Sequence, residues 1–181
     1  MNILILGDIM GRSGREVLKK NLNDLIEENK IDFVVANGEN AADDGKGITQ
    51  EIANELLSSG IDVITSGNHV WDKKEIIELV EKNNKVLRPA NFAEGSPGKG
   101  FGIYFSKKHK YKIGVINLIG NVFMRKSNDA FKVASDLKNK IKLKKDVDFL
   151  IIDFHGEITS EKMAIGHFFD GVSTAVVGTH T

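Results

Sequence analysis

Carboxylate, carboxamide and imidazole side chains follow five short apolar runs in this 181-residue sequence. Taken singly, each has an ordinary explanation, such as a turn aspartate, a polar loop or a buried histidine. A glycine stands beside nearly every one of them, and glycine lets the backbone turn sharply. A single site would explain all of these residues together, which makes it the better interpretation. The candidate residues are Asp8, Glu39, Asn40, Asn68, His69, His155 and His180.

The donors in this set are typical of a transition-metal site. Mixed oxygen and imidazole ligands suit iron, manganese or zinc better than calcium or magnesium. The sequence contains no cysteine, which excludes thiolate ligands and disulfides. Two ions about 3.5–4 Å apart can generate a hydroxide nucleophile and hold a phosphate ester, provided that one carboxylate bridges them. Glu39 is the candidate bridge, and His69 could protonate the leaving oxygen.

The apolar pattern predicts alternating strands and helices that would position these groups. A hairpin formed by Gly102–Phe105 and Tyr111–Asn117 interrupts the alternation, so we expect two sheets flanked by helices. Ligands of open α/β sheets bind at the carboxyl ends of strands, and the candidate residues are predicted to lie in loops just after them. The predicted strands are Asn2–Leu6, Asp32–Ala36, Ile61–Thr65, Val147–Ile152 and Ser173–Val177. The predicted helices are Arg15–Asn29, Thr49–Ser58, Lys73–Lys82 with Asp72 as its N-cap, Ala130–Ile141 and Thr159–Phe169.

Length and composition fit one globular domain covering residues 1–181. Lysine plus arginine and aspartate plus glutamate each number 25, so the net charge is zero. A neutral chain lacks the excess of basic residues that nucleic-acid binding requires, so we expect no stable nucleic-acid partner. The apolar start, Met1–Gly7, is too short for a signal peptide or a membrane span. We therefore expect a cytoplasmic protein with no membrane partner.

Six short motifs resemble those of the calcineurin-like metallophosphoesterases, and among these the bacterial YmdB-type phosphodiesterases. The wider superfamily has Asp-x-His in its first motif, whereas the YmdB-type group has lost that histidine, as has this sequence with Met10. The similarity runs from Met1 to Thr181. The motifs read Gly7-Asp8-Ile9-Met10-Gly11, Asn37-Gly38-Glu39-Asn40, Gly67-Asn68-His69, Asp153-Phe154-His155-Gly156-Glu157, Thr159-Ser160-Glu161-Lys162 and Gly178-Thr179-His180.

The resemblance implies a four-layer α/β/β/α sandwich and two metal ions, either iron or manganese, with zinc as the alternative. It also implies a phosphodiesterase that hydrolyses 2′,3′- or 3′,5′-cyclic nucleotides through a metal-activated hydroxide, and a homo-oligomer when full length. His69 would be the general acid. One ion would be held by Asp8, Glu39 and Asn40, and the other by Glu39, Asn68, His155 and His180.

The last motif of the family continues with a further histidine, whereas this sequence ends at Thr181. That histidine would be a ligand of the ion at Asp8. We therefore expect the sequence to be a C-terminally truncated fragment of a longer domain. In such a fragment the Asp8 site would bind its ion weakly, and turnover would be weak or absent.

Three other functions fit part of the pattern. A phosphomonoesterase would use the same metal site. A non-catalytic module, such as a metal-bound nucleotide sensor or a signalling protein, would bind its ligand without turnover. A metal-free flavodoxin-like nucleotide binder would hold phosphate at a helix start around Gly11–Gly14, although the spacing of His155 and His180 speaks against it.

Overall fold

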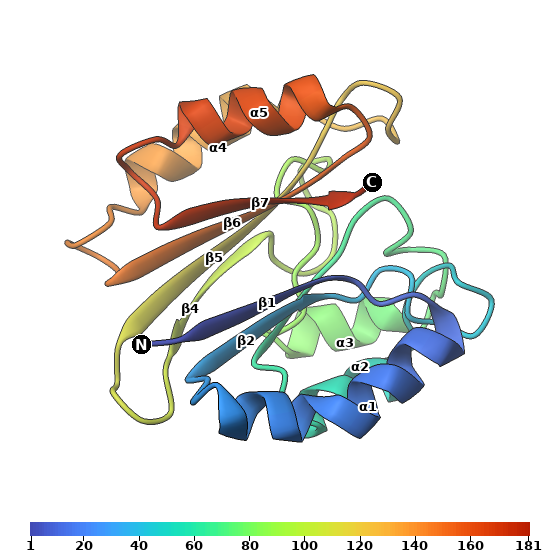
Figure 1. Cartoon of the computed structure of the whole chain (residues 1–181). Coiled ribbons are helices and arrows are strands. Elements are labelled where there is room, and N and C mark those ends of the chain that lie inside the picture. The colour runs from blue at the N-terminus through green and yellow to red at the C-terminus, as the bar shows by residue number, and fades with distance from the viewer.

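Two β-sheets lie face to face, and helices cover the outer face of each (Figure 1). The computed structural model describes residues 1–181. The first sheet is parallel, with its strands in the order β1 (Ile3–Asp8), β2 (Phe33–Asn37) and β3 (Val63–Thr65). In the second sheet only the first strand is antiparallel to its neighbour. Its order is β4 (Phe101–Phe105), β5 (Lys112–Ile119), β6 (Phe149–Gly156) and β7 (Ala175–His180).

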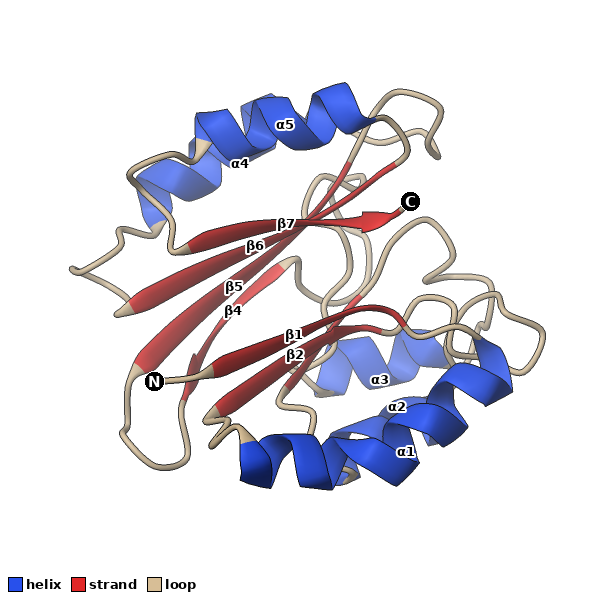
Figure 2. Cartoon of the chain, in the orientation of Figure 1, coloured by secondary structure: helices blue, strands red, loops and turns tan.

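The helices fall into two groups on opposite sides of the sheets, as Figure 2 shows. The first sheet is covered by α1 (Gly11–Glu28), α2 (Gln50–Ser58) and α3 (Ile76–Lys82). The second sheet is covered by α4 (Ala130–Lys140) and α5 (Thr159–Phe168). None of these helices combines the length and the apolar character that a membrane crossing requires.

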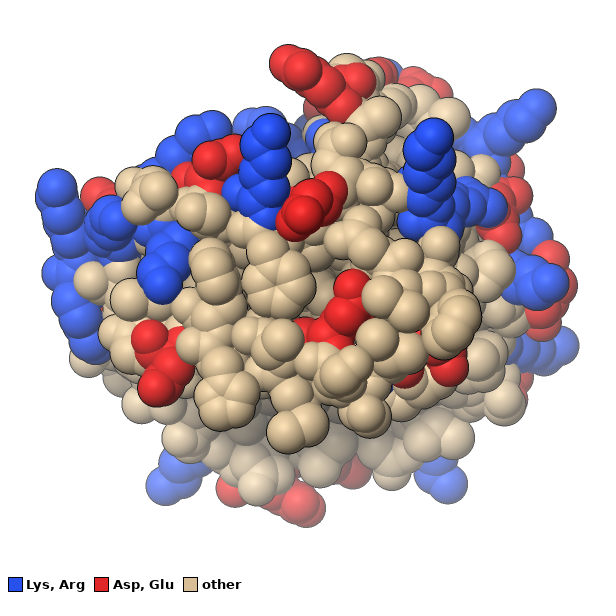
Figure 3. Space-filling view, turned by 90° about the horizontal axis from the view of Figure 1, so that it is seen from above, with Lys and Arg blue, Asp and Glu red and all other residues tan.

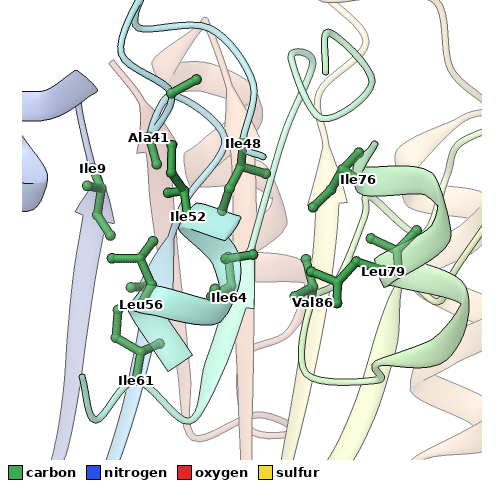
Figure 4. Packing of buried hydrophobic residues seen from close by; sticks show 14 of the residues in the cluster. Ile9, Ala41, Ile48, Ile52, Leu56, Ile61, Ile64, Ile76, Leu79 and Val86 are labelled. Carbon is green, nitrogen blue, oxygen red and sulfur yellow. The ribbon is translucent and has the colours of Figure 1, made fainter. Parts of the chain in front are cut away.

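Separate apolar clusters hold each helical group to its sheet. Sixteen buried residues join the first sheet to its helices, among them Ile52, Leu56 and Ile64 (Figure 4). Twelve others, including Phe154 and Ile165, join the second sheet to α4 and α5. Because side chains at a helical period face the sheets, this burial provides the main stabilisation of each layer.

A third apolar cluster joins the two sheets. Alternate residues of β2 face opposite sides, since side chains alternate along a strand. Val34 and Ala36 pack against the helices, whereas Phe33 and Val35 face the second sheet, where they meet residues such as Val115. Central strands buried on both faces read as continuous aliphatic runs. The predicted α/β class, with two sheets flanked by helices, is confirmed, and the predicted hairpin is the antiparallel pair β4–β5.

The predicted ends of three strands that carry candidate residues are wrong. Strands β1, β6 and β7 continue to Asp8, Gly156 and His180, so Asp8, His155 and His180 lie within strands rather than in loops after them. The ladder extends through polar residues because each has a backbone partner in a neighbouring strand, as in the pair Asn117 and Asp153. A polar residue therefore does not mark the end of a strand when the neighbouring strands continue beside it.

Two predicted helix starts are also wrong. Helix α1 begins at Gly11 rather than at Arg15. Helix α3 begins at Ile76 with no side-chain cap, and Asp72 bonds to the ring of His69 instead. The flavodoxin-like alternative is wrong as well, since that fold has one sheet with its first strand inside, whereas here β1 is an edge strand of one of two sheets.

Candidate metal centre

Strands from both sheets bring their carboxyl ends to one edge of the molecule, the edge at which the chain ends in Figure 1. Asp8 is the last residue of β1, and His180 is the last residue of β7. His155 lies near the end of β6, and Glu39 follows β2. One ligand atom from each of these four residues lies within 4.8 Å of the others. Both sheets thus contribute to one cluster of carboxylates and imidazoles.

Two asparagines extend this cluster from neighbouring loops. Oδ1 of Asn68 lies 3.1 Å from Nε2 of His155. Nδ2 of Asn40 donates to Oδ2 of Asp8 and to Oε1 of Glu39, at 3.2 Å each. A metal would require the carboxamide oxygen instead, so Asn40 can become a ligand only after its amide rotates by about 180°. All six predicted ligands therefore lie in one group, with Asn40 in a hydrogen-bonding orientation.

Glu39 lies at the centre of the group and is fully buried. Its Oε1 is 2.9 Å from Nε2 of His155 and 4.0 Å from Nδ1 of His180, and it also accepts from Asn40. Its Oε2 accepts the backbone N–H of His69 at 3.0 Å. Oε1 is thus the atom at which the two imidazoles of the cluster meet the Asn40 side chain.

The buried pair of Glu39 and His155 shifts the pKa of both groups. Burial disfavours the charged form of Glu39, but the hydrogen bond and charge of His155 outweigh it, so the pKa of Glu39 lies below its usual value. Burial likewise disfavours the imidazolium, but the hydrogen bond and charge of Glu39, with the charge of Asp8, raise the pKa of His155. A positive charge is therefore favoured at this point. A metal cation can supply that charge in place of the proton.

A network of buried polar groups contacts Nδ1 of His155, the ring nitrogen on the side away from Glu39. The Thr179 hydroxyl donates to Oδ1 of Asp153 at 2.7 Å, so its lone pair accepts from Nδ1 of His155 at 3.0 Å. Asn37 donates to the other oxygen of Asp153 at 3.3 Å. With its proton on Nδ1, the neutral imidazole presents the lone pair of Nε2 to the cluster. The supporting groups therefore select the tautomer that a metal requires.

Sequence reasoning missed these supporting residues. Asn37, Asp153 and Thr179 belong to the motifs that carry the candidate ligands, yet no role was predicted for them. Each is buried within a strand whose other residues are mostly apolar. A polar residue in such a strand needs a partner, and that requirement is the signal that could have identified them.

His69 lies beside the cluster and outside it. Its Nδ1 is 2.7 Å from Oδ2 of Asp72, and its side chain is 26% exposed. Asp72 also pairs with Arg125, whose Nη2 lies 3.4 Å from Oδ1. Because Nδ1 is engaged by Asp72, Nε2 is the ring nitrogen that remains for another partner.

Gly67 has no space for a side chain. A β-carbon there would overlap the ring of His155 and the carboxylate of Glu39. The backbone before Asn68 therefore approaches the cluster as closely as glycine alone allows. This explains the glycine of the Gly67-Asn68-His69 motif by contact rather than by backbone conformation.

The residues of the cluster fit a transition metal by donor type and by proximity. Fold and cluster together define an α/β protein whose strands end at a candidate metal site. Its residues 4–181 match the family described as YmdB-like protein, and the chain belongs to that family. The predicted membership in the YmdB-type group is thereby confirmed.

Three known proteins illustrate the similarity. The chain is 45% identical over 181 residues to the 2′,3′-cyclic-nucleotide 2′-phosphodiesterase of Bacillus subtilis (strain 168), covering 100% of this chain and 67% of that protein. The crystal structure of a hypothetical protein from Thermus thermophilus superposes with a TM-score of 0.90 at 36% identity, covering 100% of this chain and 68% of that one. A novel phosphatase from Mycoplasma pneumoniae gives a TM-score of 0.88 at 36% identity, covering 99% and 63%. The chain thus spans about two thirds of the length of the curated relatives that it matches.

Proposed function

We propose that this protein is a phosphodiesterase that hydrolyses cyclic nucleotides at a two-metal centre. One observation carries the proposal: the buried carboxylate of Glu39 faces ligand atoms of Asp8, His155 and His180, all within 4.8 Å of one another. The proposal is supported by 45% identity to a Bacillus subtilis protein named as a 2′,3′-cyclic-nucleotide 2′-phosphodiesterase. On the same grounds we place residues 1–181 in one domain of the four-layer α/β/β/α metallophosphoesterase type.

The proposal assigns two ions to the cluster. Iron or manganese, with zinc as the alternative, suits carboxylate, carboxamide and imidazole donors. Two bound ions would neutralise charge on the phosphoryl oxygens and lower the pKa of a bound water. One ion is assigned to Asp8, Glu39 and Asn40, and the other to Glu39, Asn68, His155 and His180.

The chain's own residues orient the site and move the proton of the leaving group. Thr179 holds His155 in the tautomer that turns Nε2 toward the cluster. Asp72 holds the ring of His69 by Nδ1. Nε2 of His69 is then free to donate a proton to the departing alkoxide oxygen as a general acid.

Hydrolysis of adenosine 2′,3′-cyclic phosphate tests the proposal. A chain that continues past Thr181 to the further histidine of the last motif is incubated with this compound and Mn²⁺, and the phosphorus resonances are followed by NMR. We expect the 2′ ester to open and adenosine 3′-phosphate to accumulate, and the variant Glu39→Gln to be inactive. Binding of the compound without turnover, in the presence of manganese, iron or zinc, would instead identify a nucleotide sensor.

A phosphomonoesterase is the second candidate, because one of the similar structures is named as a phosphatase. The same reaction distinguishes the two functions. A phosphodiesterase stops at adenosine 3′-phosphate, whereas a phosphomonoesterase leaves the cyclic ester intact and releases inorganic phosphate from added adenosine 3′-phosphate. Both products resolve in the phosphorus spectrum.

We further propose that the protein acts in the cytoplasm, as a homo-oligomer, on small nucleotides rather than on nucleic acid. Basic and acidic side chains lie among one another on the face that carries α4 and α5 (Figure 3), in keeping with a net charge of zero. Nucleic-acid binding depends on clustered positive charge. Light scattering of the purified protein would measure the size of the oligomer.

A further inference from the structure

The loop between β5 and α4, residues 120–129, exposes an aromatic ring. Phe123 is 85% exposed, and its φ of 59° lies in the left-handed region. That conformation is strained for a bulky residue, and a phenylalanine side chain is stabilised by burial rather than by exposure. Folding alone therefore gives no reason for this arrangement. Strained residues of this kind gather at functional sites.

The residues before Phe123 are anchored beside the metal cluster. The N–H of Gly120 donates to the carbonyl of His155 at 2.9 Å. The N–H of Val122 donates to the carboxylate of Glu161 on α5 at 3.2 Å. The loop therefore leaves the sheet at the same edge as the cluster, and in Figure 1 it projects as the gold segment on that side of the molecule.

The residues after Phe123 are anchored beside His69. Met124 packs on a small buried cluster that includes Val70. Arg125 pairs with Asp72, the carboxylate that holds the ring of His69. Phe123 therefore lies, with its ring exposed, in a loop that is bonded to the His155 side through Gly120 and to the His69 side through Arg125.

We propose that Phe123 is a stacking platform for the nucleobase of the substrate. The inference rests on the proposed function and adds to it the residue that binds the base of the nucleotide. An aromatic face stacks on any base, so the platform favours nucleotides over base-free esters without selecting one base by hydrogen bonding. Purines offer a larger ring area than pyrimidines, so we expect purine nucleotides to bind more tightly.

The test compares a substrate that has a base with one that lacks it. Adenosine 2′,3′-cyclic phosphate and glycerol 1,2-cyclic phosphate present the same reactive ring. Phe123→Ala should raise KM for the adenosine compound roughly tenfold, with kcat nearly unchanged and no effect on the glycerol compound. Phe123→Tyr should restore binding. The matched control is Phe105→Ala, because Phe105 is also exposed, at 62%, but pairs with Lys112 at the opposite end of β5.

Equal losses for both compounds, or the same loss in Phe105→Ala, would overturn the proposal. A change in oligomer size for Phe123→Ala without a change in KM would also overturn it, since the ring would then contact another copy. If the chain extended past Thr181 hydrolyses neither ester, the proposed function fails, and saturation transfer from the protein to the adenine protons of adenosine 3′-phosphate decides the inference. Transfer that persists undiminished in Phe123→Ala would contradict stacking.

Discussion

Nε2 of His155 lies 2.9 Å from Oε1 of Glu39, and neither side chain is accessible to solvent. Removing two charges from water costs more than their attraction usually returns, so a buried ion pair is weak evidence for stability. The pair is instead surrounded by further ligand atoms, since Asp8 and His180 complete the cluster. An arrangement that costs stability and gathers metal donors is better explained by cation binding than by folding.

Metal binding should raise the thermal stability of this protein. A ligand that binds only the folded state at 100 times its dissociation constant adds about 2.7 kcal/mol. We expect the melting temperature of chelator-treated protein to rise when Mn²⁺ or Zn²⁺ is added. The variant Glu39→Gln removes the central carboxylate charge and should show little rise. Differential scanning calorimetry measures the effect, and an equal rise in both proteins would place the bound ion elsewhere.

Replacement of His69 should separate catalysis from metal binding. In a chain extended past Thr181 through the further histidine of the last motif, His69→Ala removes the proposed general acid and should lower turnover by roughly 10²–10⁴-fold. Its metal content should stay near normal, because the ring bonds to Asp72 and lies outside the cluster. His155→Ala and Asn68→Ala should lose metal as well as turnover. Elemental analysis of each variant settles the point: if His69→Ala empties a site, His69 is a ligand.

The sequence predicted the parts of the site that have distinctive chemistry. Histidines and carboxylates next to glycines stand out in a sequence, and for this reason Glu39 and His155 could be recognised as candidate ligands from residue type and position alone. Thr179 and Asp153 were missed because a polar residue in an aliphatic strand has many possible partners, and only the packing of β6 beside β7 selects one.

The same limit applies to conformation. Glycine is the residue that adopts a left-handed φ most readily. The left-handed conformation of Phe123 therefore cannot be predicted from its residue type, and the sequence alone does not distinguish it from other exposed aromatic residues. The helix start at Ile76 was misplaced for a related reason, because Asp72 has the right type for a cap but a stronger partner in His69. Periodicity thus predicted the elements, whereas their ends depend on tertiary contacts.

The hydroxyl of Thr179 should affect metal affinity through its hydrogen bond to Nδ1 of His155. Thr179→Val keeps the shape of the side chain but removes the acceptor for Nδ1, so the imidazole is no longer fixed in its metal-binding tautomer. Loss of such a supporting group costs roughly 10–100-fold in metal affinity. Calorimetric titration with Zn²⁺ measures this. Thr174→Val, which removes a hydrogen bond to the backbone of Leu150, is the control and should leave affinity unchanged.

An equal fall in zinc affinity for the Thr179 and Thr174 variants would show that loss of either threonine hydroxyl, within β7 or just before it, weakens binding by loosening the sheet. The role of Thr179 would then be structural. Restored affinity in Thr179→Ser would support the specific hydrogen bond, because serine retains the hydroxyl.

Space, rather than backbone conformation, should make Gly67 irreplaceable. In Gly67→Ala the new methyl group would overlap His155 and Glu39, so one of them must move away from the cluster. We expect a loss of about 1–3 kcal/mol of stability from overpacking, together with weaker metal binding.

The control is Gly166→Ala in α5, where a β-carbon meets nothing within 4 Å. There alanine should stabilise the helix by roughly 0.5–1 kcal/mol and leave metal binding unaltered. Urea denaturation and metal titration of both variants make the comparison, and a Gly67→Ala protein that binds metal normally would mean that the cluster can shift to make room.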